Sequence, residues 1–251
     1  MSDNELDNNK APLLEHLAEL RKRLLVCCVG IIIAFFGFYF VSADIYNFLV
    51  HPLAAATEGQ VGRRMIFTGL HEAFLTQVKV AFFASICFSF PVLSVQIWRF
   101  IAPGLYSKEK QAFLPFILAT PLFFILGASF VYYMVIPLAW DFFLSFEQSA
   151  GNGILPMQLE PKVDEYLSLI MRLIIAFGIC FELPVLIVLL TKVGLTNSKS
   201  LKNKRKYAVL IAFVVAAVIT PPDVISQILL AVPIIVLYEI SIWCSKIIEE
   251  D

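Results

Sequence analysis

The stretch YLSLIMRLIIAFGICFELPVLIVLL, residues 166–190, decides the fold class of this chain. It is almost continuously apolar, and as a helix rising about 1.5 Å per residue it is long enough to cross a hydrocarbon core about 30 Å thick. Similar runs at about 24–43, 74–98 and 112–136 precede it. Of all residues 59% are hydrophobic and 16% charged, whereas a soluble domain has roughly 25% charged residues. The sequence therefore predicts an all-α polytopic membrane protein, forming one domain over residues 1–251.

Two shorter apolar segments follow, at about 207–220 and 225–244. A helix over the first would reach only about 21 Å, which is short for a bilayer, and Pro233 shortens the second. Pro221 and Pro222 separate the two segments, because neither continues a helix from the residue before it. The pair could form one hairpin that does not cross, or two short spans that thin the bilayer locally. We favour two short spans, which gives six transmembrane helices whose last two are short.

The basic residues orient these spans. With the N-terminus inside, the inner segments carry fourteen Lys and Arg residues, and the outer segments carry only Arg63, Arg64 and Lys162. Because inner loops are enriched in Lys and Arg, we expect both termini to be cytoplasmic and residues 1–23 to form an amphipathic cytoplasmic lead. The lack of a transit peptide favours a bacterial inner membrane over an organellar one. The tryptophans fall at segment ends and are expected in interfacial belts: Trp98, Trp140 and Trp243.

Glu182 is the acidic side chain that lies deep in an apolar segment. Phe181 and Leu183 flank it, and Pro184 follows two residues later. A proline at that position leaves the carbonyl of Cys180 without its helical donor. A carboxyl group at membrane depth is costly, and it suggests a function by default. The pattern therefore predicts an intramembrane polar site at Glu182.

Two further acids lie on the expected inner side. Glu19 precedes the first span and is one helical turn from Arg23, which is the spacing of a surface ion pair. Glu109 follows Ser107, a candidate helix cap, and would sit in the first turn of the third span. Both could be ordinary surface residues. The alternative is a cytoplasmic acidic site for a basic ligand.

Catalysis and nucleic-acid binding lack their usual motifs. The three histidines are isolated in the sequence, and no HExxH, GxSxG or P-loop pattern occurs. The basic stretch 199–206 is explained more simply as an orientation signal that faces anionic lipid. We therefore expect no enzymatic activity, no metal, no cofactor and no nucleic-acid partner. A small-solute secondary transporter is the alternative function, although it would need several inward polar residues per helix.

Four motifs in chain order resemble the TatC family of the twin-arginine protein translocase. They are HLAELRKRL (16–24), FIAPGLYSKEK (100–110), FGICFELPV (177–185) and ITPPDVISQ (219–227). The resemblance covers essentially the whole chain. It implies a curved, glove-like six-helix bundle that has no enzymatic activity. Such a bundle would be the receptor for signal peptides that carry two consecutive arginines, on proteins that cross the membrane already folded.

The resemblance also implies partners and site residues. Transport would be driven by the protonmotive force, with the single-span subunits TatB and TatA, other copies of the chain and membrane lipid as partners. Carboxylates can bind guanidinium groups in bidentate geometry, and the family pattern places the signal-peptide site at Glu19, Glu109, Arg21 and Phe100. It places an intramembrane polar region, where partner helices dock, at Glu182, Thr220 and Gln227. It places residues that shape the outer cap at Pro52 and Asp223.

Overall fold

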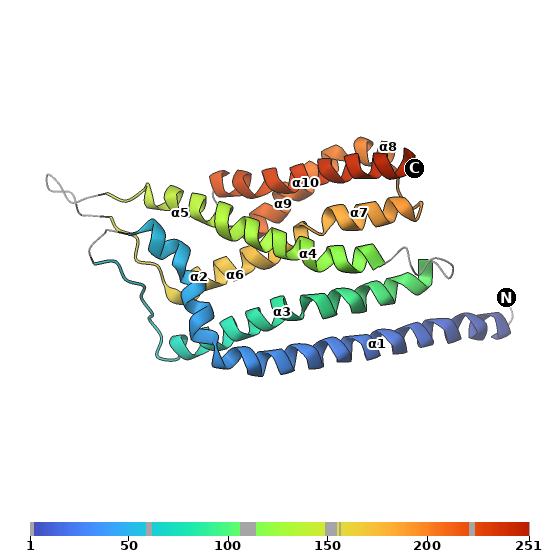
Figure 1. The fold of residues 1–251 in the computed structure, drawn as a ribbon, viewed down its shortest axis with the longest axis horizontal. Helices are drawn as coiled ribbons and strands as arrows, with labels where there is room; N and C mark the ends of the chain where they lie inside the picture. Colours follow the sequence, from blue (N-terminus) through green and yellow to red (C-terminus); the bar gives the residue numbers. More distant parts are fainter. Residues whose placement is uncertain are drawn as a thin grey trace.

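The computed structural model describes residues 3–58, 62–105, 114–148, 155, 157–220 and 224–250, with side chains described except at 3–15, 101–105, 114 and 250. The described chain is helical, apart from two isolated β-bridges that join Ile66 to Lys162 and Gln148 to Met157. Its helices are α1 (Asp3–Phe40), α2 (Ser42–Ala56), α3 (Glu72–Leu105), α4 (Leu114–Phe130), a π-helical stretch (Val131–Val135), α5 (Ile136–Leu144), α6 (Val163–Cys180), α7 (Leu183–Lys192), α8 (Ser198–Asn203), α9 (Arg205–Ile219) and α10 (Val224–Glu250) (Figure 1). The prediction of an all-α polytopic membrane protein is confirmed.

Five helical stretches are long and apolar enough to cross a membrane. They are His16–Phe40, Glu72–Phe100, Pro115–Leu144, Val163–Lys192 and Val224–Glu249. The third runs through α4, the π-helical stretch and α5 without a break, so it extends beyond the apolar run 112–136. The helix α9 has 15 residues and is not among the five. Its shortness agrees with the short apolar segment in the sequence. The prediction that the last helix is also short is wrong, because α10 has 27 residues and continues through Pro233.

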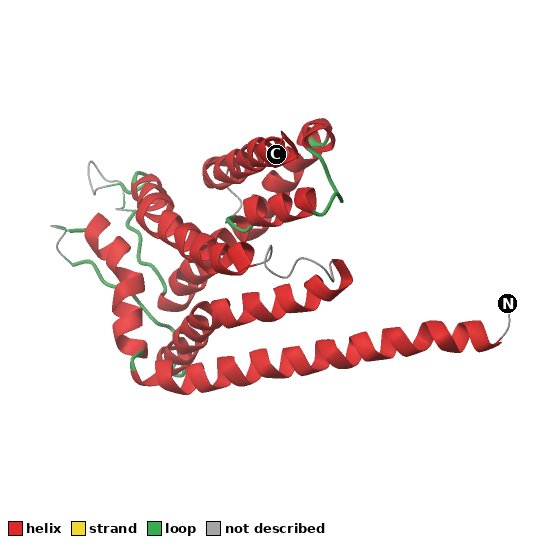
Figure 2. Cartoon of the chain, turned by 45° about the vertical axis from the view of Figure 1, so that its right-hand side comes forward, coloured by secondary structure: helices red, strands yellow, loops and turns green. Residues whose placement is uncertain are grey.

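The helices form one bundle, in which most long helices pack against the long helix that precedes or follows them in the sequence. The helix α1 packs along α3, α4 packs on α6, and α10 packs on α7 and α9 (Figure 1). The first turns of α1 project beyond the other helices (Figure 2). The start of α1 and the end of α10 lie at the same end of the bundle, and α2 lies at the other end. We call the end that holds α2 the cap end.

The helices α4 and α6 cross at two glycines. A methyl group on Gly127 would lie 2.5 Å from the carbonyl oxygen of Phe177, and one on Gly178 would lie 2.4 Å from the ring of Phe124. Small residues allow helix backbones to approach this closely in membranes. The close crossing fixes the end of α6 against α4 and so determines what surrounds Glu182.

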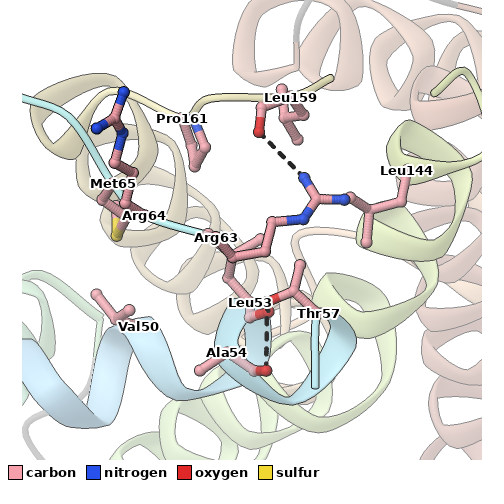
Figure 3. Close-up of a pocket in the computed structure, with 10 residues that line it drawn as sticks. All are labelled: Val50, Leu53, Ala54, Thr57, Arg63, Arg64, Met65, Leu144, Leu159 and Pro161. Atoms are coloured by element: carbon pink, nitrogen blue, oxygen red, sulfur yellow. Dashed lines mark hydrogen bonds between the residues drawn. The ribbon is translucent and has the colours of Figure 1, made fainter. Parts of the chain in front are cut away.

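At the cap end an ion pair joins two distant connections. Arg63 donates through Nη1 to Oε1 of Glu147, at 2.6 Å, and to the carbonyl of Leu159, at 3.1 Å, while its Nη2 pairs with Oε2 of Glu147. The amide of Leu159 donates to Oε1 of Glu147, at 2.8 Å. Figure 3 shows Arg63 reaching across a cavity of about 170 Å³ towards Leu159, between Leu53 of α2 and Leu144 of α5. The connection after α2 is therefore tied to the connection after α5.

The tie predicts how the cap responds to acid. Hydrogen bonds from Arg63 and from the Leu159 amide, together with the guanidinium charge, hold the pKa of Glu147 below its ordinary value of 4.5. A carboxyl group whose pKa is lowered by folding stabilises the folded state while it is ionised. That contribution is complete above the ordinary pKa and disappears as pH falls through the lower folded value. Spin labels at Thr68 and Ser145 should therefore keep a fixed separation down to about pH 5, and separate only below about pH 4.

The Glu147→Gln variant should show a broader distribution of label distances at every pH, because its amide cannot form a charged pair with the guanidinium, while the backbone bridge of Ile66 with Lys162 still holds the two connections near each other. Glu160→Gln is the matched control, since the ion pair that Glu160 forms among the described residues is an exposed one with Arg64, at 3.5 Å. A cap that loosens between about pH 7 and 5, or that is unchanged by Glu147→Gln, would contradict the role given to this ion pair.

Candidate functional site

The end of the bundle opposite the cap brings the first two sequence motifs together. The imidazole ring of His16 on α1 stacks on the ring of Phe100 on α3, with centroids 4.2 Å apart and planes inclined by 15°. Glu19 lies one turn further along α1, and its Oε2 is 3.9 Å from Nδ1 of His16. The packing of α1 along α3 thus places an acidic group of the first motif near the aromatic residue that opens the second.

The carboxylate of Glu19 is accessible and already holds a guanidinium. Its side chain is 35% exposed. It accepts hydrogen bonds from Nε of Arg23, at 3.0 Å, and from Nη2 of the same residue. Arg21 is exposed on the same helix. Glu109 lies outside the described residues, so its pairing with Glu19 stays a prediction.

Glu182 lies where the long fourth apolar run is interrupted. The helix α6 ends at Cys180, and α7 begins at Leu183 with Pro184 in its first turn. The amide of Phe181 still donates to the carbonyl of Phe177, at 2.9 Å. The break therefore lies at the position that the proline predicts, because Pro184 cannot supply the donor that a continuous helix needs.

The carboxyl group of Glu182 is incompletely satisfied. Its side chain is half-buried and lies beside the hydroxyl of Thr120 on α4. That hydroxyl already accepts a hydrogen bond from the indole Nε1 of Trp98, at 2.9 Å. Oε1 of Glu182 is buried, and no described residue donates a hydrogen bond to it. A buried acceptor without a donor is costly, which makes this carboxyl group available to a donor from outside the chain.

Thr220 and Gln227 are both directed at the end of α9. The Thr220 hydroxyl donates to the carbonyl of Ala216, at 2.8 Å, and Nε2 of Gln227 donates to the carbonyl of Phe213, at 3.1 Å. The Ala216 carbonyl also accepts from the amide of Thr220, at 2.9 Å, so the hydroxyl is a second donor to it. In the free chain both side chains are therefore bonded to the backbone of α9. Asp223 lies outside the described residues.

Pro52 is buried within α2 at the cap end. Having no N–H, it leaves the carbonyl of Phe48 without its helical donor. The Tyr132 hydroxyl, from the π-helical stretch, donates to this carbonyl at 2.7 Å, and the rings of Phe48 and Tyr132 stack. The proline thus exposes a backbone acceptor that docks α2 onto the third long stretch.

Several contacts at these sites were not predicted from the sequence. The tryptophans were expected in interfacial belts, but Trp98 and Trp140 are buried, and only Trp243, 66% exposed, faces outward. Trp98 supports the Glu182 environment through Thr120, which is 22 residues away in sequence. No local pattern distinguishes an interfacial tryptophan from one that donates a buried hydrogen bond, because both positions suit a large ring with one polar atom.

Comparisons with known proteins give a consistent result. The family model described as Sec-independent protein translocase protein (TatC) matches residues 15–233. The Sec-independent protein translocase protein TatC of Magnetococcus marinus is 49% identical over 240 residues, which cover 96% of this chain and 86% of that protein. The protein of the same description from Escherichia coli is 40% identical over 94% of this chain and 88% of its own length. A crystal structure of the twin arginine translocase receptor TatC superposes with a TM-score of 0.80, at 36% identity, over 93% of this chain and 99% of that one.

Proposed function

Because this chain belongs to the TatC family and is the core subunit of the Sec-independent twin-arginine translocase, we propose that it binds twin-arginine signal peptides of folded cargo at the end of the bundle opposite the cap. It is a translocase receptor subunit and not a catalytic enzyme. Membership of the TatC family also excludes the alternative function considered from the sequence, a small-solute secondary transporter. The predictions of family and function from the four motifs are confirmed.

The observation that carries the proposed binding site is the stacking of His16 on Phe100. It fixes α1 against α3, so that the Glu19 carboxylate lies near Phe100, the residue that opens the second motif. Arg23 occupies that carboxylate in the free chain, which shows that a guanidinium fits there. An arginine of the signal peptide would displace Arg23, and Glu109 would hold the second arginine. Arg21 and Phe100 would flank the two carboxylates.

The topology that we propose has six spans with both termini in the cytoplasm of a bacterium. It is supported by the start of α1 and the end of α10 lying at one end of the bundle, because an even number of crossings returns the chain to its starting side. Five stretches are long enough to cross by themselves. The sixth span would be α9, whose 15 residues extend about 22 Å, so the bilayer would be thinned beside it. The bundle would present the curved, glove-like concave face typical of the family.

We further propose that the single-span subunits TatB and TatA dock at Glu182, Thr220 and Gln227, and that the protonmotive force drives transport. Support comes from the buried Oε1 of Glu182, which has no donor among the described residues. A partner helix that brought a hydroxyl or amide group would satisfy it. Thr220 and Gln227 would exchange their bonds to α9 for bonds to the partner.

The binding site can be tested with a purified twin-arginine signal peptide and the chain in nanodiscs. Glu19→Gln should weaken binding by roughly ten-fold or more, because a hydrogen bond between charged groups contributes about 1.5–3 kcal/mol. Arg23→Gln should not weaken binding, since it frees the Glu19 carboxylate while removing the same intrahelical pair. Fluorescence anisotropy of a labelled peptide measures both variants.

Glu160→Gln is the matched control, because it removes an exposed acid from the cap end. If Glu19→Gln and Arg23→Gln weaken binding equally, the ion pair only stabilises α1, and the assignment of Glu19 to the peptide site is wrong. If a wild-type chain with its partner subunits fails to bind the peptide at all, the proposed location of the receptor site must be abandoned.

A further inference from the structure

A groove at the cap end shares Thr220 with the proposed partner site, but its other walls belong to no functional site described above. Its volume is about 690 Å³, within the range of roughly 300–1,000 Å³ typical of small-ligand pockets. Its walls come from three places in the chain: Trp140 of α5, Tyr166, Ser168 and Arg172 of α6, and Thr220 at the end of α9. The rings of Trp140 and Tyr166 stack, with centroids 5.1 Å apart, so one wall of the groove is rigid and aromatic.

The charges in the groove leave one guanidinium unpaired. Glu165 pairs with Lys162, at 3.5 Å, and Asp164 pairs with Lys79. Arg172 is exposed, and it forms no ion pair with any residue that the structure describes. It lies one turn beyond Ser168 on the same face of α6, because residues four apart are neighbours on a helix. The groove therefore offers a cation without an ion-pair partner among the described residues, one helical turn from the hydroxyl group of Ser168.

The depth of Arg172 suits the headgroup region of a bilayer. The stretch Val163–Lys192 has 30 residues and is about 45 Å long, so about 7 Å would extend beyond a 30 Å core on each side. Arg172 lies nine residues after Val163, at about 13.5 Å, which puts its backbone about 6 Å inside the core. The side chain is long enough to bring its guanidinium group to the boundary of the core, where the headgroup region begins.

We propose that this groove binds the headgroup of one anionic phospholipid from the leaflet at the cap end, with Arg172 and Ser168 on the phosphate and Trp140 and Tyr166 beside the glycerol backbone. Arg is suited to phosphate because its planar group donates two parallel hydrogen bonds. Basic pockets between transmembrane helices bind anionic headgroups in this manner. An arginine whose side chain only extended to the headgroups of the surrounding bilayer would not require a groove beside it.

A partner helix is a weaker fit to the groove. Lys162, Asp164, Glu165 and Arg172 all line it, and such a charged wall suits a hydrated headgroup better than the apolar, small-residue seam of two packed helices. Arg172 also lies on the cap side of the break at Glu182, and Glu19 lies at the opposite end of the bundle. Loss of the lipid should therefore leave binding of the signal peptide unchanged.

The test is native mass spectrometry of the purified full chain, titrated with phosphatidylglycerol or with phosphatidylcholine of the same acyl chains. The wild type should bind one phosphatidylglycerol about ten-fold more tightly than phosphatidylcholine. Arg172→Gln should remove this preference, and Arg172→Lys should keep part of it. Arg64→Gln is the matched control, because it removes an exposed cation of the cap outside the groove. Inorganic phosphate at about 1 mM should not compete, since it lacks the acyl chains.

Equal affinity of the wild type for the two lipids would overturn the proposal, as would an unchanged preference in Arg172→Gln. If Arg172→Gln keeps the lipid preference but no longer co-purifies with a single-span partner subunit, the groove serves a partner helix and the lipid assignment is wrong. Thermal unfolding of each variant excludes misfolding as the cause, and binding of the signal peptide to Arg172→Gln separates failure of this proposal from failure of the receptor site.

Discussion

Replacing Gly127 with alanine should destabilise the detergent-solubilised protein by about 3 kcal/mol. The added methyl would lie 2.5 Å from the carbonyl oxygen and 2.9 Å from the carbonyl carbon of Phe177. These are backbone atoms of α6, so they cannot move aside as the end of a flexible side chain can. The two helices must separate, and the contacts along their whole crossing weaken. The unfolding midpoint should fall by roughly 6 °C or more, because about 1 kcal/mol shifts it by 2–4 °C in a chain of this size.

Gly37→Ala is the matched control. It adds the same methyl to α1, where nothing lies within 4 Å of the added carbon. Alanine is also the better helix former by about 1 kcal/mol, so this variant should be as stable as the wild type or slightly more stable. Equal midpoints for the two variants would mean that α4 and α6 do not cross at the glycines.

Replacing Glu182 with leucine should reduce transport at least ten-fold without lowering stability. Oε1 of this carboxyl group is buried and has no donor among the described residues, so the free chain bears the cost of an unsatisfied acceptor. An apolar side chain of similar size removes that cost, and the unfolding midpoint should stay level or rise. Transport should fall, because the proposed partner contact needs a polar group here. Export of a reporter cargo and thermal unfolding of the same preparation measure both effects.

Thr120→Val is the companion variant for Glu182. It removes the hydroxyl that accepts from Trp98 and leaves that buried indole N–H unpaired, so it should destabilise by about 1–3 kcal/mol. Comparing the stability of the two variants therefore distinguishes the Thr120 hydroxyl, which stabilises the bundle, from the Glu182 carboxyl group, which we propose contacts a partner. If Glu182→Leu is destabilised as much as Thr120→Val, the carboxyl group is a structural element of the bundle. The docking role proposed for it would then fail.

The fold could be predicted from the sequence where the signal is local. Apolar runs near 20 residues give the long spans, because only a helix satisfies its own backbone in lipid. The break before α7 was predictable from Pro184, since proline removes a donor wherever it lies. The limited length of α9 follows from the short apolar segment before Pro221.

Contacts between distant residues could not be predicted in this way. The pair of Arg63 and Glu147 joins residues 84 apart in sequence, and nothing next to either residue marks the other. The stacking of His16 on Phe100 depends equally on how α1 and α3 pack. Gly127 was not singled out, because a glycine in an apolar helix becomes informative only once its neighbour is known.

In the candidate sites, too, contacts within one helix could be predicted from the sequence and contacts between helices could not. The sequence indicated a helix for Glu19 and a proline-disturbed apolar run for Glu182, but it did not indicate what surrounds either residue. The sequence predicted the ion pair of Glu19 with Arg23, because it lies within one helix. It did not predict that Oε1 of Glu182 would be left without a donor among the described residues, since that depends on which side chains of α4 lie beside the break.

The central claim is that Glu19 contacts an arginine of the signal peptide, and a double-mutant cycle tests it most directly. Affinities would be measured for the wild type and Glu19→Gln, each with the native peptide and with peptides in which one arginine at a time is replaced with glutamine. Residues in contact couple by about 0.5–3 kcal/mol. We predict a coupling of at least about 1 kcal/mol, or roughly five-fold in affinity, for one of the two arginines. Additive losses for both arginines would contradict the account, because Glu19 would then contact neither.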